Sequence, residues 1–319
     1  MSRPFEQADG ASGAGISGPA RVGVSALPGS LSLRERLSDL AELAKLRISL
    51  LVLFVTGAGY CLGAPRPIGP AGLLHALFGT ALVAVAANIL NQVMERRWDR
   101  LMRRTTDRPI AAGRVDARAA AAVSVGLAGL GVAYLALAAN LLAAALAATT
   151  LILYLFAYTP LKRVTEHNTL VGAVPGALPP LIGYAAAAGT IDEAAGWLFA
   201  ILFVWQIPHF YAIAWLYRED YRRAGYRMLS AADETGSSTA RQTVAYSVAL
   251  LAVSFGPLVA GKAGPVFAVM ACALGVMMFA AAARFAISLS RAGARHVVLA
   301  SVIYLPALIS AWLFASYRG

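Results

Sequence analysis

The sequence predicts an all-α protein that crosses a membrane about nine times, with its helices around a central cavity. Of its 319 residues, 59% are hydrophobic and only 13% are charged, whereas a soluble domain carries roughly a quarter charged residues. The apolar residues also gather in runs of about twenty, the length that a helix needs to cross the hydrocarbon core. Composition and run length together exclude an ordinary water-soluble domain.

The first forty residues are predicted to be a disordered and juxtamembrane tail, followed by one membrane domain over 41–319. Residues 1–30 are rich in Gly, Ser, Ala and Pro. A signal peptide would place a basic end before a short apolar core and a small-residue cleavage site, and that order is missing. The first long apolar run, which starts near Ile48, is therefore expected to be a retained spanning helix.

Turn-forming residues divide the apolar sequence into separate helices. Pro65 and Pro67 follow the first run, Asn140 separates the third from the fourth, and Pro265 opens the eighth. The predicted spans are 46–64, 72–94, 117–138, 140–158, 169–189, 195–216, 242–261, 265–289 and 297–316.

The positive charges predict the orientation of these spans. The chain has 27 Lys and Arg against 16 Asp and Glu, and all but Arg66, Lys262 and Arg318 fall on the side of the N-terminus when the loops are assigned alternately. The positive-inside rule then places the N-terminus in the cytoplasm and the C-terminus outside. Topology thus explains the basic excess, and the expected partner is the lipid bilayer rather than nucleic acid. Neither Cys61 nor Cys272 has the spacing of a disulfide framework or a metal site.

Oxygen-bearing side chains lie at the end of the second helix. Asn91, Glu95 and Asp99 are four residues apart, so they share one face of a helix. Oxygen ligands suit Mg²⁺, which is commonly shared with the phosphates of a substrate, and Arg104 and Arg108 downstream can bind the same phosphates. An ordinary juxtamembrane face whose acids pair with its own arginines explains the spacing equally well.

A second polar cluster follows the fourth run, from Tyr158 to Asn168. Residues 172–180 then contain Gly and Pro at a density that breaks a helix, which a membrane tolerates only where the backbone is buried in protein or lines a cavity. The fifth span is therefore expected to line a pocket. Lys162 and Arg163 fit either an anionic ligand or the positive-inside rule, and both interpretations stay open.

The third cluster closes the sixth span and contains Pro208-His209-Phe210, followed by Glu219-Asp220-Tyr221. A histidine inside an apolar run is either hydrogen-bonded packing or a functional group, and the sequence does not decide between them. The acids after the second and sixth spans are expected to face one cavity.

These motifs, in this order, resemble the protoheme IX farnesyltransferase (haem O synthase) family, a branch of the intramembrane UbiA-type prenyltransferases. The likeness extends from about residue 40 to the C-terminus. As in haem O synthases, Glu95 stands where the wider family usually has Asp, and Glu219-Asp220 replaces a motif of spaced aspartates. The motifs that carry the likeness lie at 91–109, 158–168, 172–180 and 208–225.

The resemblance implies transfer of a farnesyl group from farnesyl diphosphate to a vinyl side chain of haem b, with addition of water, to give haem O and diphosphate. It implies Mg²⁺ as the cofactor and leaves open a direct partnership with haem A synthase. The implied location is a bacterial inner membrane, with the active site toward the cytoplasm. The implied catalytic residues are Asn91, Glu95, Asp99, Lys162, Arg163 and Asp220, of which Asn91, Glu95, Asp99 and Asp220 would bind the metal. The implied substrate-binding residues are Arg104, Arg108, Tyr158, Asn168, His209 and Tyr221.

Two alternative functions compete with this one. A prenyltransferase acting on a quinone precursor or a chlorin would share the spans, the metal and the diphosphate, but Glu95 and the Pro-His-Phe segment favour haem. A transporter would also show broken helices, but it places its coupling charges near the middle of the bilayer, whereas the acids of this sequence lie at the ends of spans.

Overall fold

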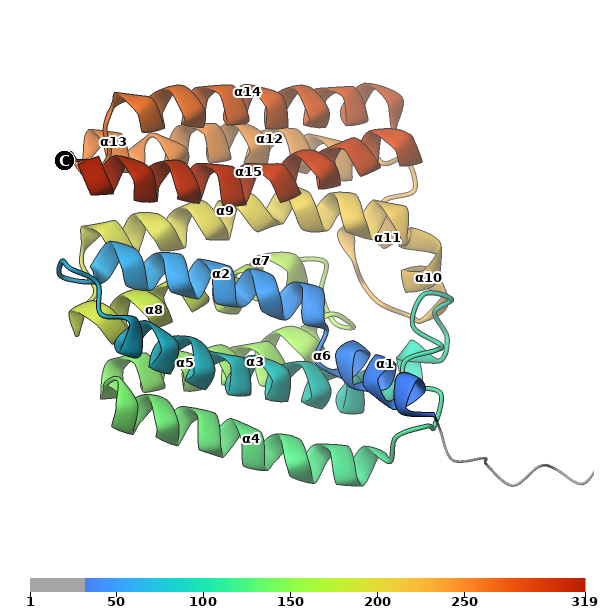
Figure 1. Cartoon of the computed structure of the whole chain (residues 1–319). Helices are drawn as coiled ribbons and strands as arrows, with labels where there is room; N and C mark the ends of the chain where they lie inside the picture. Colours follow the sequence, from blue (N-terminus) through green and yellow to red (C-terminus); the bar gives the residue numbers. More distant parts are fainter. Residues whose placement is uncertain (1–31, 319) are drawn as a thin grey trace, which may run out of the picture.

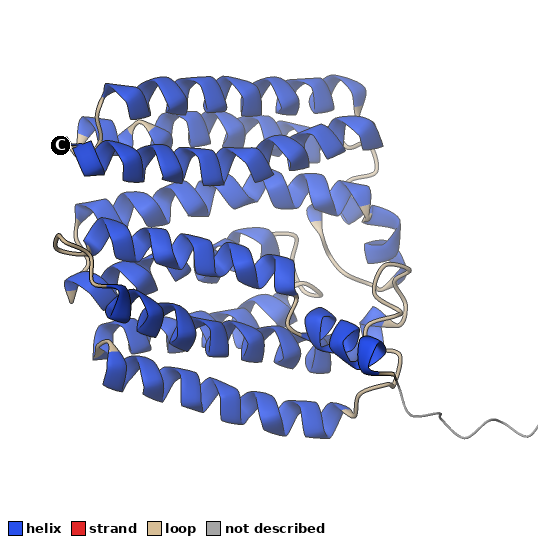
Figure 2. Ribbon diagram, in the orientation of Figure 1, coloured by secondary structure: helices blue, strands red, loops and turns tan. Residues whose placement is uncertain are grey.

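The computed structural model describes residues 32–318, and every regular element in that part of the chain is a helix (Figures 1 and 2). Within it, nine stretches are long and apolar enough to cross a membrane, which confirms the predicted multi-pass fold. Five of them are single helices: α2 (Leu46–Gly63), α3 (Pro70–Asp99), α4 (Ala117–Ala138), α9 (Glu193–Leu216) and α14 (Pro265–Ser288). Three are composite: α5 (Leu141–Ile152) with η1 (Leu153–Tyr158) and α6 (Thr159–Leu161), α7 (Asn168–Ala177) with α8 (Pro179–Ala188), and α12 (Ser237–Ser254) with α13 (Gly256–Val259). The last lies within α15 (Arg291–Arg318).

A short helix, α1 (Leu33–Leu43), precedes the first span. Ser32 caps it, because its hydroxyl accepts a hydrogen bond from the Glu35 backbone N–H while the Glu35 carboxylate accepts one from the Ser32 backbone. Of the tail predicted over 1–40, residues 1–31 lie outside the described part, and residues 33–40 belong to this helix. Regular structure therefore begins before residue 41.

Polar residues fix the starts of several spans. Asn140 and Asp116 accept hydrogen bonds from backbone N–H groups three residues ahead, and Asp192 accepts two from the first turn of α9. These side chains satisfy N–H groups that a helix leaves without partners at its start. Asn140, one of the turn signals in the sequence, is thus a helix cap.

The helices lie side by side in layers (Figure 1). Helix α9 runs between the group α12, α14 and α15 and the group α2, α7 and α8, while α4 lies on the far side of α3 and α5. The largest buried core joins α9 to α14 and α15 through side chains that include Leu198, Phe267, Tyr304 and Trp312. Helix α1, the end of α3, α10 (Arg218–Arg223) and α11 (Leu229–Ala232) meet at one end of the bundle, and the C-terminus lies at the other.

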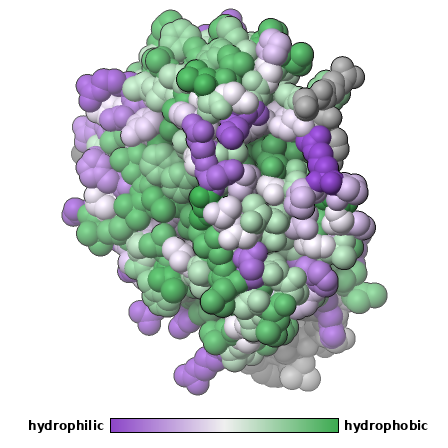
Figure 3. All heavy atoms as spheres, turned by 90° about the vertical axis from the view of Figure 1, so that its left-hand side faces the viewer, coloured by the Kyte–Doolittle hydropathy of each residue, from purple (hydrophilic) through white to green (hydrophobic). Residues whose placement is uncertain are grey.

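The end of the bundle that carries the C-terminus is the face turned to the viewer in Figure 3. Hydrophobic residues cover much of this face, with hydrophilic residues scattered among them. The sequence places only Arg66, Lys262 and Arg318 of its basic residues on this side. The charged groups with buried partners instead gather at the opposite end.

Backbone contact joins α2 to α8. A Cβ atom on Gly59 would lie 1.9 Å from the carbonyl oxygen of Pro180, and one on Gly183 would lie 1.8 Å from that of Thr56. Glycine is therefore required at both positions, as in the small-residue interfaces by which membrane helices approach closely.

A π-helical turn, η1, interrupts the fourth span just before Pro160. Proline has no N–H to donate and crowds the preceding turn, so the helix widens there. The Thr159 hydroxyl donates to the Tyr154 carbonyl at 2.8 Å across this wider turn. The turn brings Thr159 and the following Lys162 toward α3.

Substitution of Gly183 by Ala should destabilise the bundle, because its Cβ would overlap the α2 backbone. We expect a loss of ~3 kcal/mol, at the upper end of the range for overpacked cores, measured as a lower midpoint of thermal unfolding in detergent. Gly196→Ala is the matched control, since a Cβ there meets no atom within 4 Å. Equal midpoints for the two variants would contradict the packing argument.

Candidate active site

Three polar side chains form a buried row along the last turns of α3. Asn91, Glu95 and Asp99 are exposed by only 1%, 5% and 0%. Residues four apart rise ~6 Å along a helix and stay on one face, so the predicted oxygen-rich stripe is present. It is far more buried than an ordinary juxtamembrane face.

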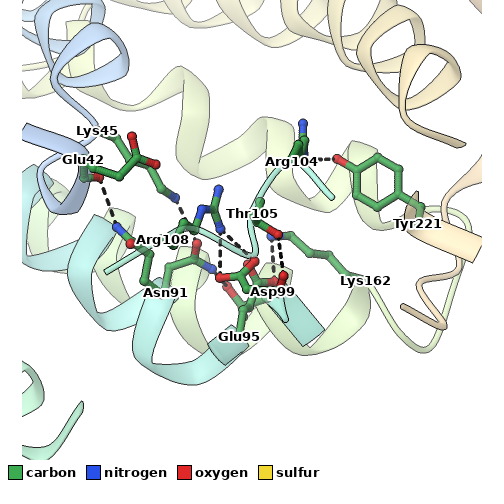
Figure 4. Close-up of polar contacts among 12 residues, drawn as sticks. Glu42, Lys45, Asn91, Glu95, Asp99, Arg104, Thr105, Arg108, Lys162 and Tyr221 are labelled. Atoms are coloured by element: carbon green, nitrogen blue, oxygen red, sulfur yellow. Dashed lines mark hydrogen bonds and ion pairs between the residues drawn. The ribbon is translucent and has the colours of Figure 1, made fainter. Parts of the chain in front are cut away.

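Each acid of this row is paired with a cation from another segment (Figure 4). Arg108 donates from one guanidinium nitrogen to both Asp99 carboxylate oxygens, at 2.8 and 3.0 Å. Lys162 donates from Nζ to Glu95 Oε1 at 2.9 Å. The partners of the acids thus come from the loop after α3 and from the end of α6.

Asn91, the third residue of the row, makes hydrogen bonds through both the oxygen and the nitrogen of its side-chain amide. Its Oδ1 accepts from Lys45 Nζ at 3.1 Å, and its Nδ2 donates to the Thr159 hydroxyl at 3.2 Å. Lys45 lies at the turn between α1 and α2. The start of the first span is therefore bound directly to the polar row.

The charges of the cluster favour an anion. Burial, together with the positive charges of Arg108 and Lys162, lowers the pKa of Lys45 to about 7. Burial also opposes protonation of Lys162, but the negative charge of Glu95 outweighs it and raises the pKa of that ammonium above its ordinary value. Arg108 and Lys162 balance the two carboxylates, and an anionic ligand would favour the protonated, positively charged form of Lys45.

The loop after α3 is held in shape by its own polar contacts. Thr105 donates from its hydroxyl to the Asp99 carbonyl at 2.9 Å, and Arg100 donates from Nε to the Ala111 carbonyl at 2.7 Å. Arg114 pairs with Asp39 of α1 at 2.7 Å. These contacts return the chain over the end of α3 and place Arg108 beside Asp99.

The segment after α9 contributes aromatic and acidic groups. The Tyr221 hydroxyl accepts from Arg104 at 2.7 Å, and the Arg104 guanidinium lies 4.5 Å from the centre of the Tyr217 ring. Asp220 is 8% exposed and pairs with Arg223 of its own helix at 2.9 Å. Arg104 and Tyr221 are thus brought together, whereas Asp220 has a local partner.

The residues of the second predicted cluster, 158–168, make contacts of different kinds. The Lys162 ammonium lies 4.6 Å from the centre of the Tyr158 ring, but the Arg163 guanidinium lies over the Trp98 ring at 4.0 Å. Asn168 is fully buried and donates to the carbonyls of Thr165 and Arg227, at 2.6 and 2.9 Å. The structure therefore brings Lys162, but not Arg163, into contact with an acid of α3.

The glycines of the fifth span are explained by close packing. A Cβ on Gly172 would lie 2.5 Å from the Tyr158 ring, and one on Gly176 would lie 2.1 Å from the Gln206 amide oxygen. The break between α7 and α8 is short, since Leu178 at the junction keeps helical backbone angles. These glycines seat α7 against η1 and α9.

His209 lies on the α9 face that meets α15. Its Nδ1 is 2.7 Å from the Ser301 hydroxyl, and its ring stacks on that of Trp205, with 5.3 Å between centroids. Ser301 donates its single hydroxyl proton to the Val298 carbonyl at 2.7 Å. The hydroxyl must therefore accept from Nδ1–H, which leaves the lone pair of the imidazole on Nε2.

Comparison with known proteins shows the family of this chain. The model of the UbiA prenyltransferase family matches residues 52–303. The chain belongs to the UbiA prenyltransferase family. Protoheme IX farnesyltransferase of Solibacter usitatus (strain Ellin6076) is 46% identical to this member over 277 residues, which cover 84% of this chain and 95% of the relative.

Solved structures of UbiA-type proteins share the fold. A structure of digeranylgeranylglyceryl phosphate synthase has a TM-score of 0.73 at 16% identity and covers 89% of this chain and 100% of that one. A UbiA homolog from Archaeoglobus fulgidus bound to GPP and Mg²⁺ has a TM-score of 0.60 at 13% identity, covering 86% and 99%. At these identities the likeness establishes the arrangement of the helices.

The donor set of this prenyltransferase suits Mg²⁺ shared with a diphosphate. Glu95 and Asp99 offer carboxylate oxygens and Asn91 an amide oxygen, and Mg²⁺ is typically held by one or two carboxylates with water and substrate phosphates completing its shell. Across residues 32–318, no three His, Cys, Asp or Glu side chains gather closely enough to hold a metal ion by themselves. Asp220, predicted as a fourth ligand, does not join Glu95 and Asp99 in such a group.

Sequence reasoning missed Lys45 as a residue of the prenyltransferase site. Its place just before the first span was explained by the positive-inside rule alone. Its backbone has a φ of +45°, a left-handed conformation that is uncommon for a non-glycine residue and concentrates at functional sites. Only the structure gives this signal, because Lys45 lies 46 residues from Asn91.

Glu95→Gln should destabilise the prenyltransferase, because Lys162, whose side chain is 11% exposed, would lose its counter-charge. We expect a loss of ~3 kcal/mol, as for a broken buried pair, measured as a lower thermal midpoint in detergent. Glu219→Gln is the control, since that side chain is 65% exposed and exposed pairs contribute at most about 1 kcal/mol. Similar midpoints for both variants would refute a stabilising role for the Glu95 pair.

Proposed function

We propose that this prenyltransferase transfers the farnesyl group of farnesyl diphosphate to a vinyl carbon of haem b and adds water, giving haem O and diphosphate. The observation that carries the proposal is the 46% identity to a protoheme IX farnesyltransferase across 95% of that relative. The buried row of α3 adds to it, because its acids and cations are the groups that a metal diphosphate needs.

Farnesyl diphosphate would bind with its charged end against the row of α3. Asn91, Glu95 and Asp99 would hold Mg²⁺, whose chemistry there is to neutralise charge on the departing diphosphate. The UbiA homolog from Archaeoglobus fulgidus bound to GPP and Mg²⁺ supports this assignment. Asp220 stays a proposed metal ligand, although its carboxylate pairs with Arg223 in this structure.

The cations of the site would bind the diphosphate oxygens directly. Arg108 and Lys162 already lie within 3.0 Å of the acids that would take up the metal. Lys45 is hydrogen-bonded to Asn91 of the same row, and Arg104 is hydrogen-bonded to Tyr221. Charge-assisted hydrogen bonds from these groups would strengthen as the bond to carbon breaks and charge grows on the leaving group. Arg163, predicted to be catalytic, would act through its contact with Trp98.

The bond changes follow from the substrates. The allylic C–O bond of farnesyl diphosphate breaks and diphosphate leaves with the electron pair. The electrons of the vinyl C=C bond form the new C–C bond, and the adjacent carbon takes the oxygen of water, which loses one proton to solvent. Water must be excluded until the C–C bond has formed, as it would be in a site between packed helices.

His209 is proposed to contact haem b. The hydrogen bond from its Nδ1 to Ser301 leaves the lone pair on Nε2, the arrangement in which a histidine can coordinate iron while its other nitrogen is held. Tyr158, Asn168 and Tyr221 would shape the binding region. Tyr158 lies against Lys162, Asn168 anchors the Arg227 segment, and Tyr221 orients Arg104.

We place the protein in a bacterial inner membrane, with its N-terminus and active site toward the cytoplasm. The distribution of Lys and Arg supports this orientation, and α1, the end of α3 and α10 share that end of the bundle (Figure 1). The product would pass to a haem A synthase.

Purified protein incubated with haem b, farnesyl diphosphate and Mg²⁺ should yield haem whose mass has increased by farnesyl plus water. Asp99→Ala should lower the rate by at least about 100-fold, because the site loses a carboxylate that would hold the Mg²⁺ neutralising the departing diphosphate. Asp107→Ala, an exposed acid in the same loop, should keep full activity. Unmodified haem, under conditions in which a quinone precursor is prenylated, would show that the acceptor is wrong, and release of no diphosphate would favour a transporter.

His209→Ala should weaken haem binding at least about tenfold, as expected for loss of an interaction worth about 1.4 kcal/mol, and leave the affinity for farnesyl diphosphate unchanged. Titration of the haem absorption band measures the first affinity and calorimetry the second. His75→Ala is the control, because His75 is also hydrogen-bonded, to Tyr134 at 2.7 Å, but lies on α3. Normal haem binding by His209→Ala would reassign this histidine to packing.

A further inference from the structure

Tyr226 has a buried hydroxyl for which the protein supplies no partner. The residue is 4% exposed, and its hydroxyl makes no hydrogen bond within the described chain. A buried polar group without a partner is costly. Such a group is a candidate for binding a ligand where it lies beside other polar groups, as Tyr226 does beside Glu95 and Lys162.

The backbone holds Tyr226 next to Lys162. The N–H of Arg227 donates to the Lys162 carbonyl at 2.8 Å, and the N–H of Tyr226 donates to the Tyr221 carbonyl at 2.9 Å. The Tyr226 ring meets the Tyr221 ring edge to face, with 5.9 Å between centroids, and packs in a cluster with Met102 of the loop after α3. Tyr226 thus lies between the Lys162 segment and the end of α3.

The hydroxyl is suited to donate rather than accept. A tyrosine phenol has an ordinary pKa of about 10, so the Tyr226 hydroxyl keeps its proton at neutral pH. The Glu95 carboxylate accepts from Lys162 and lies near the Tyr226 hydroxyl, but no hydrogen bond of normal length and angle joins it to that hydroxyl. A neutral donor beside two carboxylates and a lysine fits a ligand that brings acceptor oxygens into the cluster.

We propose that Tyr226 is a substrate-binding residue whose hydroxyl donates a hydrogen bond to an oxygen of the prenyl diphosphate. The inference rests on the diphosphate site of the proposed function, but not on haem as the acceptor. It extends the site beyond the sequence motifs, since Tyr226 follows the last residue of the motif at 208–225.

The test is Tyr226→Phe, which keeps the ring and removes only the hydroxyl. Binding of farnesyl diphosphate with Mg²⁺ is measured by calorimetry without haem, and thermal unfolding is measured without either substrate. We expect binding about 10- to 100-fold weaker, as for loss of a hydrogen bond to a charged group, and a thermal midpoint no lower than that of the wild type. In turnover, KM for farnesyl diphosphate should rise while KM for haem stays the same.

Thr80→Val is the matched control. Its hydroxyl is also buried without a partner, but it lies 15 residues before Glu95 on α3 and therefore ~22 Å away along the helix. This variant should bind farnesyl diphosphate as the wild type does. If it weakens binding as Tyr226→Phe does, the effect is general to loss of a buried hydroxyl and the proposal fails.

The outcomes separate this proposal from the function on which it rests. A loss of affinity above about threefold with an undiminished midpoint supports it, whereas a smaller loss, or a midpoint lowered together with the affinity, overturns it. Wild-type protein that binds farnesyl diphosphate but leaves haem unmodified would refute the haem acceptor and leave the role of Tyr226 standing.

Discussion

The end of α3 can be buried only because the negative charges of its carboxylates are neutralised by nearby cations. Glu95 and Asp99 are almost completely buried. Moving a carboxylate out of water without a partner costs more free energy than the net stability of a folded protein. Lys162 and Arg108 therefore have to be present for the helix to fold as it does. This requirement fixes the loop after α3 and the end of α6 beside the last turns of α3.

The same requirement extends to the segments that hold the cations. Lys162 is bound through its carbonyl to Arg227, whose own carbonyl accepts from Asn168. Arg104 is held by Tyr221 of α10. Two segments far apart in sequence, the loop after α6 and the loop after α10, are thereby joined to each other and to α3. A ligand that altered one ion pair would therefore affect both loops, because they share these contacts.

Close packing elsewhere makes this arrangement stiff. Gly59 and Gly183 bring α2 and α8 into backbone contact, and Gly176 seats α7 against the Gln206 side chain. Gln206 in turn donates to the Ala173 carbonyl at 2.9 Å. Helices held this closely cannot shift without losing many contacts at once. The cations can therefore be placed in advance for a diphosphate, which is how a site stabilises developing charge most effectively.

The sequence by itself determined the nine spans and the row formed by Asn91, Glu95 and Asp99, because apolar run length and helical period are local properties. The tertiary structure decided which partners meet that row. Lys45 is 46 residues from Asn91 and Lys162 is 67 from Glu95, and only the packing of the helices brings them together. It also decided that Asn168 anchors a loop, that Arg163 lies on Trp98 and that Tyr226 is buried beside Lys162. No local pattern encodes these contacts, since each joins segments whose distance is set by the whole bundle.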